Sequence, residues 1–444
     1  MANEQKPFES FEKFPFARIF QTFRIAIQPN KLIIAFAALF VICLAGWIMD
    51  FSKTVVASEG PQGQVTELEI YISNPTQFKK YIEDYKQSGQ RTGVFAVMWQ
   101  MAATKFHGAL NSLFSFNIPG VAQNIADYFK AILWAVRYQF IYSIILLAIN
   151  LVVISIAGGC LCRMAAQQAA RGEKPGLGES LKFSMRKFTS FFTTPLTPVG
   201  IIIALGLFIF ILGLLGNIPR AGEIIVGVSM PLALIAGALT TVVVIGTVAG
   251  FNLMFPAVAY DGSDCFDAIS RSFSYVYSKP WHMGFYTALA SIYGAICYTF
   301  VRFFAFLLLW TTHLFLRLGV WVENSKEVNK LTSIWPPPQF MKLIDYSALN
   351  TTNWSESIAG FLVYIFALVI VGMVVAFIIS FYFSANTIIY ALMRNKVDNT
   401  TTEDIYTPVE NSDFKAAAEA AKEDTSHPKA TETDKSKLEE SKPQ

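Results

Sequence analysis

The sequence predicts an all-α integral membrane protein with about six transmembrane helices. Apolar residues make up 53% of the 444 residues, and charged residues only 15%, whereas about 25% is usual in soluble domains. Several apolar runs reach the roughly 20 residues that a helix needs to cross a bilayer. A pattern of amphipathic helix, proline and apolar run also recurs along the chain.

The recurring pattern is clearest in residues 252–281, where an apolar segment ends in an acidic turn and an amphipathic helix precedes a proline. Residues 268–280 and 17–29 span equal intervals that end in proline, and residues 180–195 are similar. Their apolar positions have helical spacing. Basic, aromatic helices beside a span usually lie in the membrane interface, and a proline without an N–H favours a helix break. We therefore expect three hairpins, as pseudo-repeats, each with a cytoplasmic interfacial amphipathic helix.

The segment before this helix also has a counterpart. Three of its residues recur at the same spacing near the end of the chain: Asn252, Ala257 and Asp264, then Asn386, Ala391 and Asp398. The alternative is chance, because any multi-pass protein has apolar runs joined by basic loops. We favour a true repeat, since such periodicity indicates one unit used several times.

The N-terminal part begins with a polar, basic segment, 1–31, which carries the first amphipathic helix. Residues 32–50 form the first expected transmembrane helix. The small residues at 55–58 resemble a signal-peptidase site, but the leader before them is long, so we expect a retained anchor. Residues 51–138 form the longest loop, which we expect to be an extracytoplasmic cap.

Within this loop, the alternation of residues 65–72 predicts a strand. Residues 75–87 and 92–116 resemble helices, and a third helix is expected to begin near Val121.

The transmembrane bundle is expected in residues 139–398. Its five further spans are near 140–161, 199–215, 225–259, within 285–316, and 358–379 running on towards 392. Cytoplasmic loops at 163–196 and 260–284 and an extracytoplasmic loop at 317–357 connect them. The fourth of the six spans exceeds the length of a simple crossing, and Pro231 and Pro256 are candidate break points.

The tail, 399–444, has almost no large apolar residues, so it is expected to be disordered. The N-terminal segment, the loop after the second span and the last turn of the sixth span are basic. The positive-inside rule therefore places both termini in the cytoplasm. The predicted location is the bacterial inner (plasma) membrane.

Arg302 is the sharpest candidate for a functional residue, because it falls near the centre of the fifth span. An arginine there costs about 2.5–3.5 kcal/mol on insertion scales, so it should face the bundle, water or a partner. Asn150, Asn252, Tyr298 and backbone carbonyls are the available partners. One interpretation is a contact with an anion or a lipid headgroup; the other is a shallower span with Arg302 reaching the interface.

Other polar residues favour structural roles. His313 fits an interfacial or core histidine. The acidic turn at 261–267 lacks the frame of a calcium loop and fits helix N-capping by Asp264 or Asp267. Five cysteines in or beside apolar runs indicate no disulfide framework. We expect no catalytic, cofactor-binding or metal-binding residues, and no dense basic patch indicates nucleic-acid binding.

The chain resembles a loose group of uncharacterised bacterial multi-pass membrane proteins. It is distantly similar to the membrane domain attached to some glycerophosphodiester phosphodiesterases. The residues that carry the resemblance are Ala268, Ser272, Asp267, Lys279 and the IIYALMRNKVD segment ending at Asp398. The resemblance covers the spans but not the 51–138 loop or the tail. It implies no activity, since no phosphodiesterase domain is present in this sequence.

These observations predict a non-enzymatic membrane protein that organises membrane lipid or binds partner proteins, with the C-terminal tail as a tether. The alternative is a transporter or channel subunit for a small anion or lipid headgroup that uses Arg302. A third hypothesis, an enzyme acting on lipid at the interface, rests only on scattered polar residues.

Overall fold

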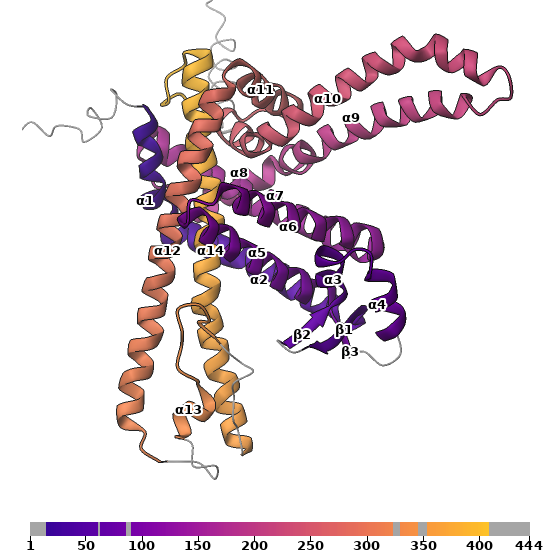
Figure 1. Cartoon of the computed structure of the whole chain (residues 1–444). Coiled ribbons are helices and arrows are strands. Elements are labelled where there is room, and N and C mark those ends of the chain that lie inside the picture. Colours follow the sequence, from indigo (N-terminus) through magenta and orange to yellow (C-terminus); the bar gives the residue numbers. More distant parts are fainter. Residues whose placement is uncertain (1–14, 61–62, 86–89, 323–328, 345–352, 408–444) are drawn as a thin grey trace, which may run out of the picture. The chain divides into compact units, whose positions relative to one another are not determined.

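Six long helices dominate the computed structural model (Figure 1), which describes residues 15–60, 63–85, 90–322, 329–344 and 353–407. They are α2 (Pro29–Met49), α7 (Phe140–Arg171), α9 (Phe188–Leu215), α10 (Gly222–Asp261), α12 (Pro280–Gly319) and α14 (Trp354–Asp398). All six are long and apolar enough to cross a membrane. This confirms the prediction of a mainly α-helical, multi-pass membrane protein.

Three of these helices are about twice as long as a bilayer crossing requires, which is about 20 residues. Helices α10 and α12 have 40 residues each, and α14 has 45. At 1.5 Å per residue, 40 residues extend about 60 Å, twice the hydrocarbon thickness. Each of these helices must therefore tilt strongly or continue beyond the lipid. The helix α10 is continuous through Pro231 and Pro256.

The C-terminal parts of three helices form the main core, which we call the hub. It consists of residues 155–170 of α7, 250–261 of α10 and 374–394 of α14, and the three segments contain most of the largest buried cluster. The helices α7, α10 and α14 all contact one another. Their other halves expose apolar side chains, such as Val228 and Phe366, as expected of surfaces that face lipid.

Short helices pack against the hub. Helix η2 (Pro15–Gln21) and α1 (Thr22–Ala26) contact α14, α8 (Leu177–Arg186) contacts α7, and α11 (Cys265–Ser278) contacts α10. The hub helices each end at a residue in the left-handed conformation: Gly172 (φ 73°), Gly262 (φ 62°) and Asn399 (φ 54°). Glycine and asparagine are the residues that adopt this helix cap most readily.

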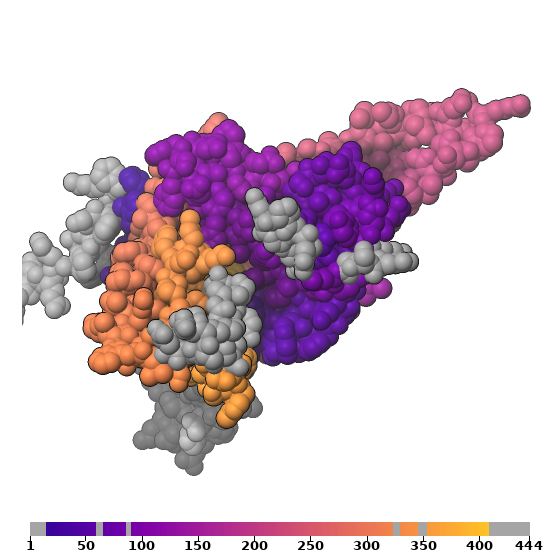
Figure 2. All heavy atoms as spheres, turned by 60° about the horizontal axis from the view of Figure 1, so that its bottom comes forward, coloured from indigo at the N-terminus to yellow at the C-terminus, as the bar shows by residue number. Residues whose placement is uncertain are grey.

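The helices α9 and α10 follow each other directly in the chain. The two helices pack along each other and are joined by residues 216–221. The space-filling view shows their outer parts lying side by side (Figure 2). Most large apolar side chains of this pair are exposed, which agrees with a lipid-facing surface.

The segment after α2 builds a second, smaller core. Strands β1 (Val55–Gly60), β2 (Gly63–Thr66) and β3 (Gln90–Thr92) form an antiparallel sheet in the order β2-β1-β3. Helices α3 (Glu67–Ser73), α4 (Phe78–Tyr85), α5 (Val94–Phe114) and α6 (Ile118–Tyr138) complete the segment. Apolar residues of these elements, including Val55, Leu68 and Trp134, form a buried cluster of their own.

Asp50 joins this segment to α2 by capping α5. Its carboxylate oxygens accept hydrogen bonds from the backbone N–H groups of Phe95 and Ala96, both at 2.8 Å, and from Tyr142 at 2.7 Å. A carboxylate at a helix N-terminus satisfies free donors and interacts favourably with the helix dipole. The residue before α5 is Gly93, where a Cβ atom would lie 2.1 Å from the Asp50 carboxyl carbon.

The predicted strand at residues 65–72 is wrong, because most of this stretch is helix α3. Thr66 accepts a hydrogen bond from the N–H of Glu69 at 3.4 Å and forms the N-cap. The sequence Thr-Glu-Leu-Glu has the spacing of a capping box. This signal for a helix start outweighs the alternation of apolar and polar residues. The longest strand of the sheet, β1, lies before this stretch in the chain.

The predicted break at Pro195 is also wrong. Helix α8 ends at Arg186, and α9 begins at Phe188 and continues through Pro195 and Pro198. By contrast, Pro29 and Pro280 stand in the first turn of α2 and α12, where the missing N–H costs nothing.

The predicted start of the disordered tail at Asn399 is wrong for its first residues. Ile405 is buried within the main core. Residues 408–444 lie outside the described part of the chain, so the prediction for them stays a prediction.

Candidate functional site

Arg302 is buried in α12, and its guanidinium is surrounded by acceptors. Its Nε donates to the carbonyl of Phe340 at 3.1 Å, and Nη2 donates to the carbonyl of Met341 at 2.9 Å. Its Nη1 donates to the hydroxyl of Tyr298 at 2.7 Å and contacts Nε2 of His107. A buried cation needs such partners. Here the protein supplies them itself, and they fix the segment around residue 340 against α12.

His107 extends this chain of hydrogen bonds into α5. Its Nδ1 lies 2.8 Å from the carbonyl of Ala103, and its Nε2 lies 3.1 Å from the hydroxyl of Tyr298. Burial, and secondly the charge of Arg302, lower the pKa of His107. A neutral ring donates from Nδ1 and accepts from Tyr298 at Nε2. The Arg302–Tyr298–His107 chain therefore links α12 to the segment after α2.

The other two predicted contact residues lie elsewhere. Asn252 in α10 accepts a hydrogen bond from Tyr382 at 2.6 Å and lines a cavity between helices. Asn150 is half-buried in α7. No hydrogen bond among the described residues joins Arg302, Asn150 and Asn252. Tyr298 and backbone carbonyls, two of the partners expected for Arg302, are present, but His107 was not foreseen.

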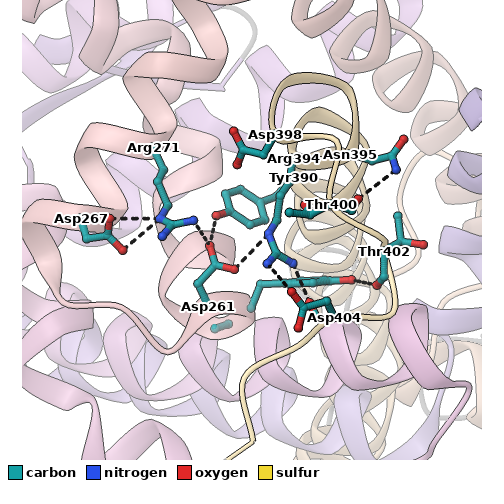
Figure 3. A network of polar contacts seen from close by, with 12 residues as sticks. Asp261, Asp267, Arg271, Tyr390, Arg394, Asn395, Asp398, Thr400, Thr402 and Asp404 are labelled. Carbon is teal, nitrogen blue, oxygen red and sulfur yellow. Dashed lines mark hydrogen bonds and ion pairs between the residues drawn. The ribbon is translucent and has the colours of Figure 1, made fainter.

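A network of ion pairs joins the hub helices at the end of α10 (Figure 3). The carboxylate of Asp261 lies 3.3 Å from Nε of Arg394 and 3.5 Å from Nη1 of Arg271, and it accepts a hydrogen bond from Tyr390. Arg271 also binds both carboxylate oxygens of Asp267 at 3.0 Å. Burial alone would lower the pKa of Arg271, but the two carboxylates outweigh it and raise the pKa. These contacts join α10, α11 and α14.

The same network holds the first residues after α14, which we call the tail root, residues 400–405. Asp404 receives hydrogen bonds from Arg394, to its carbonyl at 2.5 Å and to its carboxylate at 3.1 Å. Tyr260 donates to the carbonyl of Thr402, and Arg18 donates to the hydroxyl of Thr402. Elements from both ends of the chain therefore fix the tail root.

A further hydrogen bond supports the network from α11. Tyr275 donates to the carboxylate of Asp398 at 2.5 Å. Burial, and secondly Asp398, raise the pKa of Tyr275, so the phenol stays protonated and able to donate. Asp264 accepts from the N–H of Asp267 at 3.3 Å, which confirms its predicted N-cap role.

Lys31 is a buried lysine that the sequence analysis assigned to the polar N-terminal segment. It is fully buried at the start of α2. Its Nζ donates to the carbonyl of Ile25 at 3.1 Å and to Gln168 at 2.9 Å. It thereby joins the end of α1 to α7. In the sequence, Lys31 stands directly before an apolar run. A lysine in this position fits the membrane interface equally well, so its burial could not be predicted.

The remaining candidates have structural surroundings. His313 is buried, and its Nε2 lies 3.1 Å from the carbonyl of Trp335, which agrees with a core histidine. No group of three His, Cys, Asp or Glu side chains among the described residues could hold a metal ion.

Comparisons with protein-family models, with curated proteins and with solved structures found no match to this chain.

Proposed function

We propose that the chain is a non-enzymatic, multi-pass protein of a bacterial inner membrane that organises membrane lipid and partner proteins around its hub. The observation that carries the proposal is the fixed tail root. Arg394, Tyr260 and Arg18 bind it through its polar groups, and Ile405 anchors it in the core. An anchored root gives residues 408–444, which begin three positions after Ile405, a defined point of attachment.

The composition of residues 408–444 supports a tether. The segment alternates acidic and basic residues with Ala, Ser and Thr, and it has few large apolar side chains. Such segments bind partners through short motifs rather than through a packed core. Attachment to a membrane-embedded hub would raise the local concentration of any partner beside the membrane.

Hydrogen bonds between the short helices and the hub helices support a division of the chain into three similar units. Ser184 of α8 donates to the carbonyl of Ile156 in α7 at 2.7 Å. Ser380 of α14 donates to the carbonyl of Ala26 in α1 at 2.7 Å. Small residues and serine hydroxyls allow helices to approach closely in membranes.

We infer three units, each with a short helix followed by two long ones: η2–α1 with α2 and α7, α8 with α9 and α10, and α11 with α12 and α14. Each short helix contacts the long helix that ends the preceding unit, and η2–α1 contacts α14 of the last unit. The three hub helices also all end at a residue in the left-handed conformation, which supports this division. The spacing match of Asp264 with Asp398 adds little, because Asp264 caps α11 whereas Asp398 ends α14.

The orientation of this arrangement follows from its charges. Arg24, Arg171 and Lys396 lie in helical turns beside the hub, and Lys174 lies in the connection that follows α7. Under the positive-inside rule these charges favour a cytoplasmic hub. We infer that the short helices lie at the cytoplasmic interface. Exposed apolar residues on two of them, Leu181 and Phe266, are suited to contact lipid.

Transport of an anion through Arg302 has less support. Its guanidinium already binds two carbonyls, a hydroxyl and His107, so an incoming anion would have to replace internal partners.

The proposed function is tested by purifying the chain from native membranes in a mild detergent and identifying co-purifying proteins by mass spectrometry. The full chain is compared with a chain ending at Thr407 and with one in which residues 408–444 are scrambled. We expect stoichiometric partners with the full chain alone. Identical partners for all three, or no partner for any, would contradict the tether.

A further inference from the structure

A cavity of about 310 Å³ lies among α5, α6, α10, α12 and α14. This volume is within the usual range for small-molecule sites, about 300–1,000 Å³. Its apolar wall includes Phe106, Leu110, Leu113, Phe377 and Phe381. None of its described lining residues is charged. A site with these walls selects an apolar ligand whose bound part is neutral.

Asn386 supplies an unused polar group to this cavity. This residue is 6% exposed and lines the cavity. It forms no hydrogen bond with any residue that the structure describes. Buried amides in proteins almost always have partners, so this one indicates a ligand or water that completes it.

Asn252 and Thr287 are further polar residues that line the same cavity. The amide oxygen of Asn252 accepts from Tyr382 at 2.6 Å. This bond orients the amide and leaves its NH₂ group as the donor. The buried hydroxyl of Thr287 has no partner among the described residues. The polar lining thus offers amide donors, which match carbonyl acceptors such as those of an ester.

The polar and apolar linings are separated along α12. Thr287 follows Pro280, the first residue of α12, by seven positions, or about 10 Å, and Tyr298 follows it by 18 positions, or about 27 Å. Two small residues, Ala290 and Gly294, line the wall between them. The cavity thus has polar groups near one end of a membrane helix and rings farther along it.

We propose that this cavity binds a phospholipid of the cytoplasmic leaflet, with one acyl chain among the apolar side chains and Asn252 and Asn386 donating to its ester carbonyls. The charged headgroup remains outside, since the lining carries no countercharge. The membrane orientation in this inference is taken from the proposed function. The cavity would be the site at which the protein binds the lipid that it organises.

A neighbouring cavity accommodates the second acyl chain. It has a volume of about 410 Å³ and shares Phe106, Ala109, Tyr298 and Ile378 with the first. The rings of Phe106 and Tyr298 lie edge to face, with centroids 5.2 Å apart. These two side chains form the partition between the acyl chains.

The test measures lipid that stays with the full chain after extensive washing in dodecyl maltoside, by extraction and mass spectrometry. We expect bound phospholipid in the wild type and about tenfold less in Asn386→Leu, the loss expected when a buried hydrogen bond is removed. The control is Asn150→Leu, the same change at a half-buried asparagine of α7 that does not line the cavity. It should retain lipid like the wild type. Equal retention by Asn386→Leu, or equal loss in Asn150→Leu, would overturn the proposal.

A second measurement needs no variant. The wild-type chain is reconstituted in vesicles of phosphatidylethanolamine and phosphatidylglycerol that contain a phosphatidylglycerol with a diazirine in its acyl chain. Light should attach this probe to peptides containing residues 106–113 or 377–389. Labelling confined to the exposed faces of α9 and α10 would overturn the proposal. The tail takes no part in this site. Loss of partners from the truncated chain therefore tests the proposed function, whereas loss of lipid from Asn386→Leu tests the lipid site, and either can fail without the other.

Discussion

Arg394 of α14 lies 3.3 Å from the carboxylate of Asp261, the last residue of α10. Both side chains are largely buried, with exposed fractions of 11% and 8%. The same arginine binds Asp404. One guanidinium therefore joins two hub helices and the tail root, which makes the rigidity of the tail root depend on the hub.

Arg394→Met should destabilise the hub by about 3 kcal/mol, because it leaves the Asp261 carboxylate with fewer partners in a buried place. Thermal unfolding in detergent measures the change. The control is Arg220→Met, at an exposed position between α9 and α10, which should have little effect. Equal shifts in the two variants would show that the ion pair does not stabilise the hub.

The Arg302 site should prove structural. Arg302→Leu leaves the carbonyls of Phe340 and Met341 without their donor, so we expect a loss of about 3 kcal/mol and faster hydrogen exchange in residues 329–344. Lipid retention should persist. Arg317→Leu, at an exposed position in the last turn of α12, is the control. A loss of bound anion or lipid with unchanged exchange would instead support the headgroup hypothesis.

Acid should weaken the Arg302–Tyr298–His107 chain. The ordinary pKa of histidine is 6.5, and burial, with Arg302, lowers that of His107 in the folded protein. The unfolded chain therefore binds this proton more readily. Stabilisation from neutral His107 is complete above pH 6.5 and is lost as the pH falls through the lowered pKa.

His107→Gln should consequently flatten the decline of the melting temperature below pH 6.5. His282→Gln, in the first turn of α12, is the comparison and should leave that decline unchanged. Parallel declines in the wild type and His107→Gln would show that other groups cause the acid sensitivity.

The cap provided by Asp50 gives a local prediction. Asp50→Ala removes the acceptor for two N–H groups of α5 and for Tyr142, so stability should fall by about 1–2 kcal/mol. Hydrogen exchange should increase at Phe95 and Ala96. Glu173→Ala, at an exposed position between α7 and α8, should change neither quantity. Unchanged protection of α5 in Asp50→Ala would contradict the role of the cap.

Much of the fold could be predicted from local sequence. The apolar runs identified all six long helices, and Pro29 and Pro280 marked two of their starts. The helices extend beyond the predicted spans because packing in the hub stabilises turns that hydropathy alone does not favour. At residues 65–72, alternation and a capping box pointed to different structures, and only the capping box agreed with the fold.

The sites were harder to predict because their partners are distant in the chain. Arg302 was singled out for its position near the centre of the fifth span, yet two of its partners come from a loop 38 and 39 residues later. Asp261 was considered only within its own acidic turn, whereas Arg394 approaches it from α14. Nothing local to Asn386 indicated that its amide would face a cavity.

The most direct test of the organiser function is photo-crosslinking in living cells from Phe414, within the proposed tether. A benzophenone amino acid is introduced there and, as a control, at Ile203 on the exposed face of α9. We predict a discrete, light-dependent protein adduct from position 414 and mainly lipid adducts from position 203. Absence of a protein adduct from position 414 and from its neighbours in the tail would contradict the claim that the tail recruits partners.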